Sequence, residues 1–463
     1  MIRLLLKKEL TELRRTTRVG WLLAGLATLL GLALYNGYAY STTRSAFLKE
    51  SQRTTYQQFI SQGDKNPHLG AHFGFYAYKP TAALALVDNG LEDYTGNSFY
   101  LEPHQRGVVK FREVSDATGL RSFGFLNVGY FAQFVLPLFV FLLTHGIFAK
   151  EWENGTIKMV LSTRVRAGQL LAGKLLACGL LVGAVVAALA LGALALLLAQ
   201  GGAAAGALPA YGCYVAGLAL YALALTVLGV AVSLLARSSA LALVGLAGFW
   251  LVGVFLVPRL ASELARRAYP ATTAAAFDDQ TFHDKEYGVG HEGTKDHRRA
   301  LLEARTLAQY HVKRLEDLPV FYIPITIEYF EETDGQVMDR AYDALARTEA
   351  RQNQLVLASA VLSSFLAFRD FSLHLTATDM NTHNDFARQA EAHRRRVGGV
   401  VDAFYQQHTV ASNDFWRTVP QFAYTAPGLG WRLANAAAPL AILLGWLGAA
   451  GGLAALAYRR LRA

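Results

Sequence analysis

Seven residues of this chain match the spacing of a phosphate-binding loop. The segment from Gly168 to Lys174 reads G-x-x-x-x-G-K. A working loop of this kind carries Ser or Thr after the lysine to hold Mg²⁺, and it follows a buried strand. Here Leu175 takes that position, a basic segment precedes the match, and an apolar run follows it. We therefore predict that the chain binds no nucleotide, is not an enzyme and has no energy source of its own.

Histidines supply the other candidate chemistry. His283, His291 and His297 lie near several carboxylates, and imidazole with carboxylate oxygen can bind a transition metal. Their spacings match no recognised site, so they are weak candidate ligands, and a polar loop before a helix is the alternative. The sequence has no H-E-x-x-H segment and no Ser–His–Asp nucleophile motif. Its two cysteines, Cys178 and Cys213, build no disulfide framework. No cofactor is predicted.

The composition indicates the elements that must position these residues. Of the 463 residues, 53% are hydrophobic and 17% are charged, whereas soluble domains carry about 25% charged residues. The mean hydropathy is +0.24. These values predict a membrane protein and exclude a disordered chain.

Six apolar segments reach the length of about 20 residues that a membrane-spanning helix needs. A seventh run, Leu355 to Phe368, is shorter and is predicted as a buried or membrane-skimming helix of a soluble domain. Apart from Lys174, at the mouth of the third span, His145 is the one acidic or basic side chain inside the predicted spans, and we expect it to be capped or to face water, with a proton relay as the alternative. The predicted spans are residues 20–39, 124–148, 172–199, 214–235, 239–257 and 435–458.

Lysine and arginine predict the orientation. If the N-terminus is inside, the inner segments carry 15 basic residues against four acidic ones, counting Lys174 at the mouth of the third span. The basic charge then faces anionic lipid and a cytoplasmic partner, which argues against nucleic-acid binding. The first apolar run is longer than a signal peptide's, so an uncleaved span is expected. Both termini are predicted to be cytoplasmic. The uncleaved first span, together with the family resemblance described below, predicts a bacterial inner membrane. The inner segments are residues 1–19, 149–171, 236–238 and 459–463.

Two long segments are predicted to be exterior domains, residues 40–123 and 258–434. The first is predicted to begin with a helix and to contain short strands, and the second to be helical. Residues 1–19 form an amphipathic pattern typical of a helix in the headgroup plane, with a simple extension of the first span as the alternative. The predicted strands are Ala82–Val87 and Ser98–Leu101, the predicted helices 41–62, 296–316, 331–368 and 376–407, and Val320–Ile327 is predicted to be extended.

The inner segment 149–171 has the most recognisable pattern. Asn154-Gly155 is a turn signal, and Thr156 can cap a following helix. Apolar residues then recur at helical spacing, so we predict a short amphipathic helix between two spans, rimmed by charge. Its apolar residues are Ile157, Val160 and Leu161.

This pattern resembles the coupling region of ABC-2 type transporter permeases. The shared features are an acidic residue, then E-N-G-T, then an apolar helix ending in L-S-T-R, then a G-K-L-L that opens a span. The resemblance implies that the loop docks into a groove on a separate ATP-hydrolysing subunit; an ordinary charged loop is the alternative. By the resemblance, the docking residues are Glu151, Glu153, Asn154, Gly155, Thr156 and Arg164.

The whole chain resembles a subgroup of these permeases with a large exterior domain between the fifth and sixth spans. Short permeases of the class have only brief loops there, so inference from them does not extend to the exterior half. The stretches that carry the resemblance are Glu316–Pro319, Glu349–Gln354, Phe365–Asp370, Thr378-Asp379 and Phe386–His393.

We therefore expect an all-α polytopic membrane protein with six transmembrane helices and mainly helical exterior domains, the first with minor β structure. Because its spans carry almost no ionisable groups, its motor must lie outside the chain. The resemblance implies two ATPase copies and a second permease, identical or homologous. The expected function is ATP-driven export or extraction of an unidentified substrate. Alternatives are mechanical signalling through the exterior domains without moving cargo, and an anchored sensor that needs no ATPase.

Overall fold

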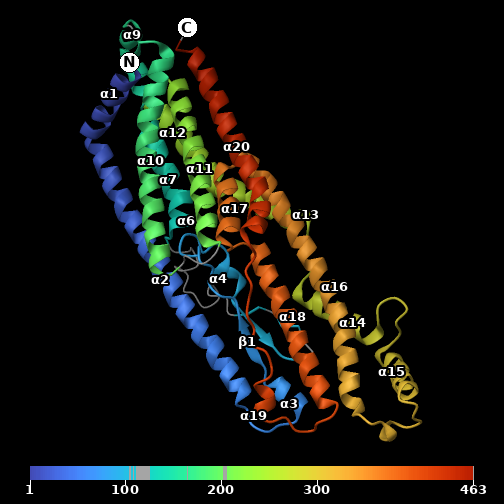
Figure 1. Ribbon diagram of the computed structural model, residues 1–463. Coiled ribbons are helices and arrows are strands. Elements are labelled where there is room, and N and C mark those ends of the chain that lie inside the picture. The colour runs from blue at the N-terminus through green and yellow to red at the C-terminus, as the bar shows by residue number, and fades with distance from the viewer. Residues whose placement is uncertain (104–105, 108, 111–125, 164, 202–205, 462–463) are drawn as a thin grey trace.

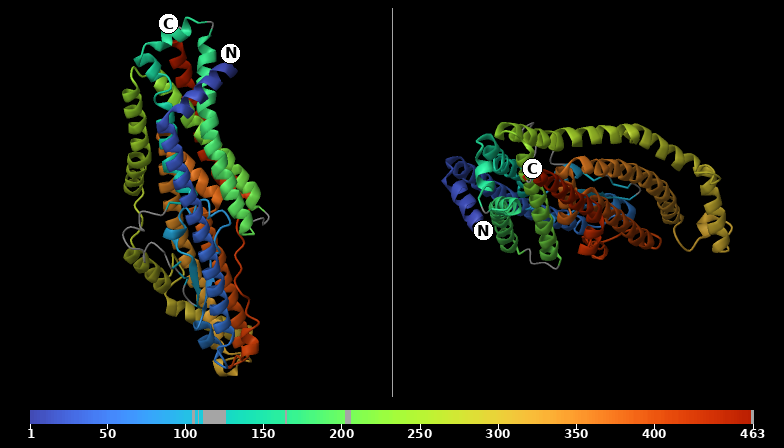
Figure 2. Two further views of the ribbon diagram at one scale, coloured as in Figure 1. Left: turned by 90° about the vertical axis from the view of Figure 1, so that its left-hand side faces the viewer. Right: turned by 90° about the horizontal axis from the view of Figure 1, so that it is seen from above.

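The computed structural model describes residues 1–103, 106–107, 109–110, 126–163, 165–201 and 206–461. It shows an elongated molecule built almost entirely of helices (Figures 1 and 2). Both termini and α9 (Thr156–Leu161) lie at one end, and α3 (Pro67–His72) and α19 (Asn413–Trp416) lie at the other (Figure 1). The predicted all-α class is confirmed.

Six helical stretches in the described residues are long and apolar enough to cross a membrane, as predicted. Each extends past its predicted apolar segment at one end or both, because helical hydrogen bonding continues beyond the lipid-length core. The second begins at Val128, later than the predicted segment 124–148, since Leu126 and Asn127 are not helical and the first two residues of that segment lie outside the described residues. The six stretches are Val19–Ile60, Val128–Glu153, Ala167–Ala199 (α10), Ala207–Leu235 (α11), Ser239–Ala268 and Leu429–Arg459 (α20).

Two of these stretches change helix type just before a proline. The second consists of α6 (Val128–Tyr130), η2 (Phe131–Val135), α7 (Leu136–Thr144) and α8 (Ala149–Glu153), and the fifth of α12 (Ser239–Leu251), η3 (Val252–Leu256) and α13 (Val257–Ala268). Both η segments are π-helical, and Pro137 and Pro258 follow them. Proline has no N–H to close a normal turn, so the helix widens there.

The N-terminal region forms two helices instead of one. α1 (Ile2–Arg15) ends at Thr16, whose extended backbone (ψ 107°) separates it from α2 (Thr17–Ile60). α2 runs for 44 residues without a break, which corresponds to about 66 Å. The predicted first span 20–39 and the predicted helix 41–62 therefore form one rod that reaches from the membrane-spanning bundle into the opposite end of the molecule.

The end of the molecule farthest from the termini has its own hydrophobic core, and we call this part the distal body. Its elements are the end of α2, α3, β1 (Phe75–Tyr78), β2 (Ser98–Leu101), α18 (Met380–Tyr405) and α19. Phe59, Phe75, Phe99, Phe386 and Trp416 are buried together there. β1 and β2 pair antiparallel, which is the minor β structure that was expected. The two predicted exterior domains thus share one core.

A side arm leaves the fifth membrane-spanning stretch and returns to the bundle. It comprises α14 (Ala274–Tyr287), α15 (Lys295–Gln309), η4 (Leu315–Asp317) and α16 (Tyr322–Ala358), and α14 and α15 lie beside the lower half of α16 (Figure 1). The prediction that Val320–Ile327 is extended is wrong, because Pro324 lies in the first turn of α16, where proline is tolerated.

The short apolar run Leu355–Phe368 is divided by the break η5 (Ser359–Leu362). Its second half begins α17 (Ser364–Thr376), which is buried along nearly all its length. α17 packs against α11 and α20, where Tyr221 and Phe368 stack with ring centroids 4.6 Å apart. Ser363 Oγ caps α17 and donates to the Gly253 carbonyl of η3 at 2.7 Å. α17 is therefore a buried helix as predicted, but it belongs to the spanning bundle and not to a separate soluble domain.

One predicted strand is wrong. Ala82–Val87 forms successive turns, and Leu84, Leu86 and Val87 are buried among the spanning helices. A Cβ on Gly37 of α2 would lie 2.1 Å from the Leu86 carbonyl oxygen. The alternation of apolar residues reflects a loop wedged into the bundle. The predicted strand Ser98–Leu101 is confirmed as β2.

Asp402 of α18 generates a prediction about stability in the distal body. Burial, followed by the charges of Glu331 and Glu328, raises the pKa of Asp402 to about 8. The unfolded chain releases this proton near pH 4, so stability should fall as the pH rises from about 4 to about 8. Asp402→Asn should flatten that dependence and raise the melting temperature at pH 8. The exposed Asp414→Asn is the control and should keep the pH dependence of the wild type. If the melting temperature of Asp402→Asn falls with pH as steeply as that of the wild type, this assignment is wrong.

Candidate functional site

The segment 149–171 forms two short helices at the end of the molecule that holds both termini. α8 closes the second membrane-spanning stretch, Asn154-Gly155 makes the turn, and α9 follows before α10 begins at Ala167. Ile157 is buried, and Val160 and Leu161 pack against the bundle core. The predicted short amphipathic helix is confirmed.

The turn depends on a glycine. Gly155 has φ +68°, in the left-handed region where a Cβ is unfavourable, and nothing lies within 4 Å of the place that a Cβ would take. The prediction that Thr156 caps α9 is wrong, because Gly155 occupies the N-cap position and no side chain caps the helix. Thr156 Oγ1 instead donates to the Glu151 carbonyl at 3.4 Å.

A buried lysine joins three elements beneath this turn. Lys174 of α10 is 2% exposed, and its Nζ lies 2.9 Å from Glu151 Oε1 of α8 and 3.1 Å from Glu9 Oε1 of α1. The same amine lies 5.2 Å from the centre of the Phe148 ring. Glu9 is also 2% exposed. We call Glu9, Lys174 and Glu151 the inner triad.

The inner triad explains the resemblance of Gly168–Lys174 to a phosphate-binding loop. The segment lies inside the continuous helix α10, and Lys174 binds two carboxylates. Gly173 has a separate role, since a Cβ there would lie 2.9 Å from Leu5 Cβ. The glycine lets α1 approach α10, and the lysine then neutralises the carboxylate that α1 brings.

α1 lies against α10 and does not simply extend the first span. Leu5 and Leu13 from its apolar face pack against the bundle core. Lys8 Nζ lies 3.0 Å from Glu9 Oε1 and 3.6 Å from Glu151 Oε1. Partial burial lowers the pKa of Lys8, but hydrogen bonds and charge from Glu9 and Glu12 outweigh it and raise the pKa. Lys7, Lys8 and Arg15 are exposed on one face of α1.

Two further polar contacts tie the segment to other spans. Glu153 Oε2 accepts hydrogen bonds from Ser239 N at 3.2 Å and Ser239 Oγ at 2.8 Å, at the first residue of α12. Ser233 Oγ of α11 accepts from Phe148 N and Ala149 N and donates to the His145 carbonyl at 2.7 Å. The segment is therefore attached to four helices of the bundle.

The predicted docking residues divide into two groups. Glu153, Asn154 and Gly155 are exposed at the turn, whereas the Glu151 carboxylate points inward to Lys174. Met159 of α9 is 65% exposed and gives the turn an apolar centre between polar neighbours. Arg164 lies outside the described residues. Thr156 is half-buried.

A family model described as ABC-2 family transporter protein matches residues 3–461. The chain belongs to this family. The resemblance inferred from segment 149–171 is thereby confirmed for nearly the whole length. Neither the comparison with curated proteins nor that with solved structures found a match. Membership makes this ABC-2 protein a permease subunit of an ABC transporter, a membrane component that is not itself catalytic and that normally works with an ABC ATPase.

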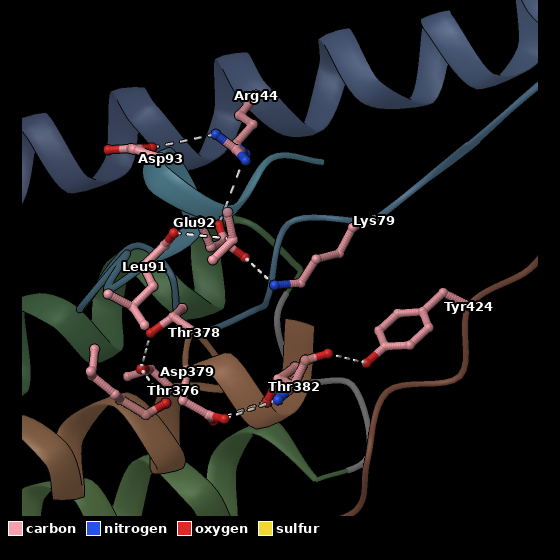
Figure 3. Close-up of polar contacts among 12 residues, drawn as sticks. Arg44, Lys79, Leu91, Glu92, Asp93, Thr376, Thr378, Asp379, Thr382 and Tyr424 are labelled. Carbon is pink, nitrogen blue, oxygen red and sulfur yellow. Dashed lines mark hydrogen bonds and ion pairs between the residues drawn. The ribbon is translucent and has the colours of Figure 1, made fainter. Parts of the chain in front are cut away.

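This ABC-2 protein carries a second ionic cluster at the opposite end of its bundle, which we call the outer cluster (Figure 3). Arg44 of α2 faces α4 (Glu92–Thr95), with its guanidinium 3.5 Å from Asp93 Oδ1 and 3.9 Å from Glu92 Oε2. Lys79 Nζ lies 3.8 Å from Glu92 Oε1. Burial lowers the pKa of Lys79, although Glu92 and Asp379 oppose that effect. Asp93 also accepts from Tyr40 Oη at 2.7 Å.

The outer cluster is tied to the turn between α17 and α18. Leu91 N donates to the Thr378 carbonyl at 2.9 Å, and Asp379 caps α18 by accepting from Thr382 N at 2.9 Å (Figure 3). Nearby, Asp88 accepts from Ser372 Oγ of α17 and from Gln133 Nε2 of η2. These contacts hold α2, the second span and α17 together.

The candidate metal ligands His283, His291 and His297 do not converge on a three-ligand metal site. His283 is on α14, His291 follows that helix, and His297 is on α15. His283 Nδ1 lies 3.6 Å from Asp284 Oδ1, and its ring contacts Tyr287. Within the described ranges, no group of three or more His, Cys, Asp or Glu side chains is placed to bind a metal ion. The predicted capping of His145 fits the 2.9 Å contact of its Nδ1 with the Leu142 carbonyl.

Sequence reasoning missed Glu9, Ser233 and Asp88. Glu9 lies on a helix whose pattern places acidic residues toward solvent, and nothing in the sequence pairs it with a residue 165 positions away. The one available signal was a lysine at the mouth of an apolar helix, since a buried amine requires a carboxylate partner. Asp88 directly follows Ala82–Val87, the segment predicted from the sequence to be a strand.

Removing the amine of Lys174 should leave the carboxylates of Glu9 and Glu151 without the positive charge that compensates them. We predict that Lys174→Met lowers the stability of the detergent-solubilised chain by about 3–5 kcal/mol, because breaking a buried ion pair leaves uncompensated charge. The triple variant Glu9→Gln, Glu151→Gln, Lys174→Met should recover most of the loss. Thermal unfolding, followed by tryptophan fluorescence, measures the stability of the single and the triple variant. Lys7→Met, at an exposed lysine of α1, is the control. A triple variant no more stable than Lys174→Met would refute the charge argument.

Proposed function

We propose that this permease couples ATP hydrolysis by a separate ATPase subunit to the export or extraction of a substrate, through segment 149–171. The observation that carries the proposal is the inner triad, which connects the exposed turn at Gly155 to α1 and α10. The family normally works with an ABC ATPase. The turn presents exposed polar groups around Met159, a surface suited to a groove on such a subunit.

The proposed stroke begins at α9. A displacement of the turn moves α8 directly, α12 through Glu153, and α1 and α10 through Lys174. α1 leads into α2 at Thr16, and α2 extends into the distal body as an unbroken helix. A rigid rod transmits displacement along its length, so the distal body moves with the inner end.

The assembly we propose contains two permeases, identical or homologous, and two ATPase subunits, in a bacterial inner membrane. Both termini and segment 149–171 are then cytoplasmic, and the distal body is periplasmic. The support is the charge balance, since the segments at the end that holds the termini carry 15 basic residues against four acidic ones.

The continuity of α2 also favours a second function, in which the ATPase moves the distal body to act on an envelope protein and no cargo crosses. The two functions differ in what ATP changes. Transport predicts ATP-dependent loss of a membrane-embedded substrate from vesicles. Mechanical signalling predicts an ATP-dependent cross-link between the distal body and an envelope protein, without such loss.

The orientation is testable by cysteine labelling. In a background with Cys178→Ala and Cys213→Ala, a cysteine at Met159 should react with a membrane-impermeant maleimide only from the cytoplasmic side. A cysteine at His291 should react only from the opposite side. Labelling of both positions from one side would contradict the proposal.

Gly155 provides the test of coupling. Gly155→Ala forces a Cβ into the left-handed region at about 1–2 kcal/mol, and should reduce the amount of ABC ATPase that co-purifies with the tagged chain from its native membranes. Gly155→Asn should stay closer to wild type, because asparagine tolerates that conformation. Gly179→Ala, in open space within α10, is the control. Absence of any ABC ATPase with the wild-type chain, or equal capture by all variants, would refute docking at this turn.

A further inference from the structure

The distal body carries two histidines whose geometry fits a metal ion. His68 and His72 lie one turn apart on α3, with their Nε2 atoms 3.3 Å apart and their ring planes at 87°. Zinc–imidazole bonds of about 2.0–2.1 Å at a tetrahedral angle place two nitrogens about 3.3 Å apart. We propose that His68 and His72 form a binding site for a divalent transition-metal ion, with Zn²⁺ as the best fit.

α3 is held firmly enough to present a fixed pair. Asn66 Oδ1 accepts from His68 N at 3.0 Å and Leu69 N at 3.3 Å, and Pro67 occupies the first turn. A Cβ on Gly70 would lie 2.3 Å from the buried Trp416 ring, so the helix backbone is in close contact with α19. The two ring nitrogens therefore meet without reorganising the helix.

The site is accessible and borders α18. His72 is exposed and His68 is half-buried, and the His68 ring stacks on Tyr405 with centroids 6.3 Å apart. His68 and His72 supply two imidazole ligands, and Zn²⁺ completes its coordination with water or with further groups. α3 lies at the opposite end of the molecule from α9 (Figure 1). This site is independent of the proposed coupling function, so either can fail without the other.

Two neutral imidazoles can also share a hydrogen bond at this distance, and that arrangement makes a different prediction. A hydrogen-bonded pair gains nothing from added metal. A metal site binds Zn²⁺ with an affinity that falls when the pH drops below the usual pKa range of imidazole, because each ligand must be deprotonated.

The experiment uses the full chain in mild detergent, stripped of metal by chelator and gel filtration. Zn²⁺ alone is titrated in competition with a chromogenic chelator, and its effect on thermal unfolding is measured in parallel. We expect His72→Gln to weaken Zn²⁺ binding by at least about tenfold and to abolish the Zn²⁺-dependent rise in melting temperature. His68→Gln should behave in the same way.

His291→Gln is the matched control and should bind Zn²⁺ as the wild type does. His72→Gln changes an exposed side chain, so it tests the proposal even if His68→Gln disturbs the packing with Tyr405. Failure of the wild type to bind Zn²⁺, or equal affinity for the wild type and His72→Gln, would overturn the proposal. Co-purification of the ABC ATPase with the Gly155 variants tests the coupling function separately, so failure of the metal site is distinguished from failure of coupling.

Discussion

A lysine buried at the mouth of a membrane-spanning helix must have its charge neutralised. Lys174 is 2% exposed, and its amine is compensated by carboxylates from two other elements. Burying one charge without its partners would cost several kcal/mol. α1 and α8 therefore cannot move away from α10 independently. The inner end of the protein is built as one unit around that requirement.

Buried charges are also compensated by partners from other elements at the opposite end of the bundle. Arg44, Lys79 and Glu92 are buried beside the half-buried Asp93, and the neighbouring loop contacts α17 through Asp88 and the turn after α17 through Leu91. α2 connects the two ends as a single helix. In the function that we propose, an input at α9 passes through the inner triad to α1 and then along α2 into the distal body.

Much of this architecture was predictable because apolar length is a strong signal. Six spans, the turn at Gly155 and the helix α9 follow from composition and local pattern alone. Burial of the loop around Leu86 was not predictable, because alternating apolar residues look alike in a half-buried strand and in a wedged loop. α17 was recognised as buried, but its place between α11 and α20 depends on contacts between residues far apart in the sequence.

The structure places the predicted docking residues in different surroundings. Glu153 and Gly155 are exposed at the turn, while Glu151 points inward to Lys174, whose sequence context resembles a phosphate-binding loop. The partner of that lysine on α1 could be found only once the helices were placed. Ionic contacts between distant segments leave no periodic signature.

The most direct test of the account is a distance measured between the rod and the side arm during ATP turnover. Cysteines are introduced at Lys49 of α2 and Arg347 of α16 in a chain without Cys178 and Cys213, and both are spin-labelled. Electron paramagnetic resonance then measures the distance between the labels while the chain is bound to its ATPase. The account predicts that ATP with vanadate shifts the distance in the otherwise native chain, and that the shift shrinks when the inner triad carries the substitutions Glu9→Gln, Glu151→Gln and Lys174→Met. A shift of unchanged size in that triple variant, with the ATPase still bound, would contradict it.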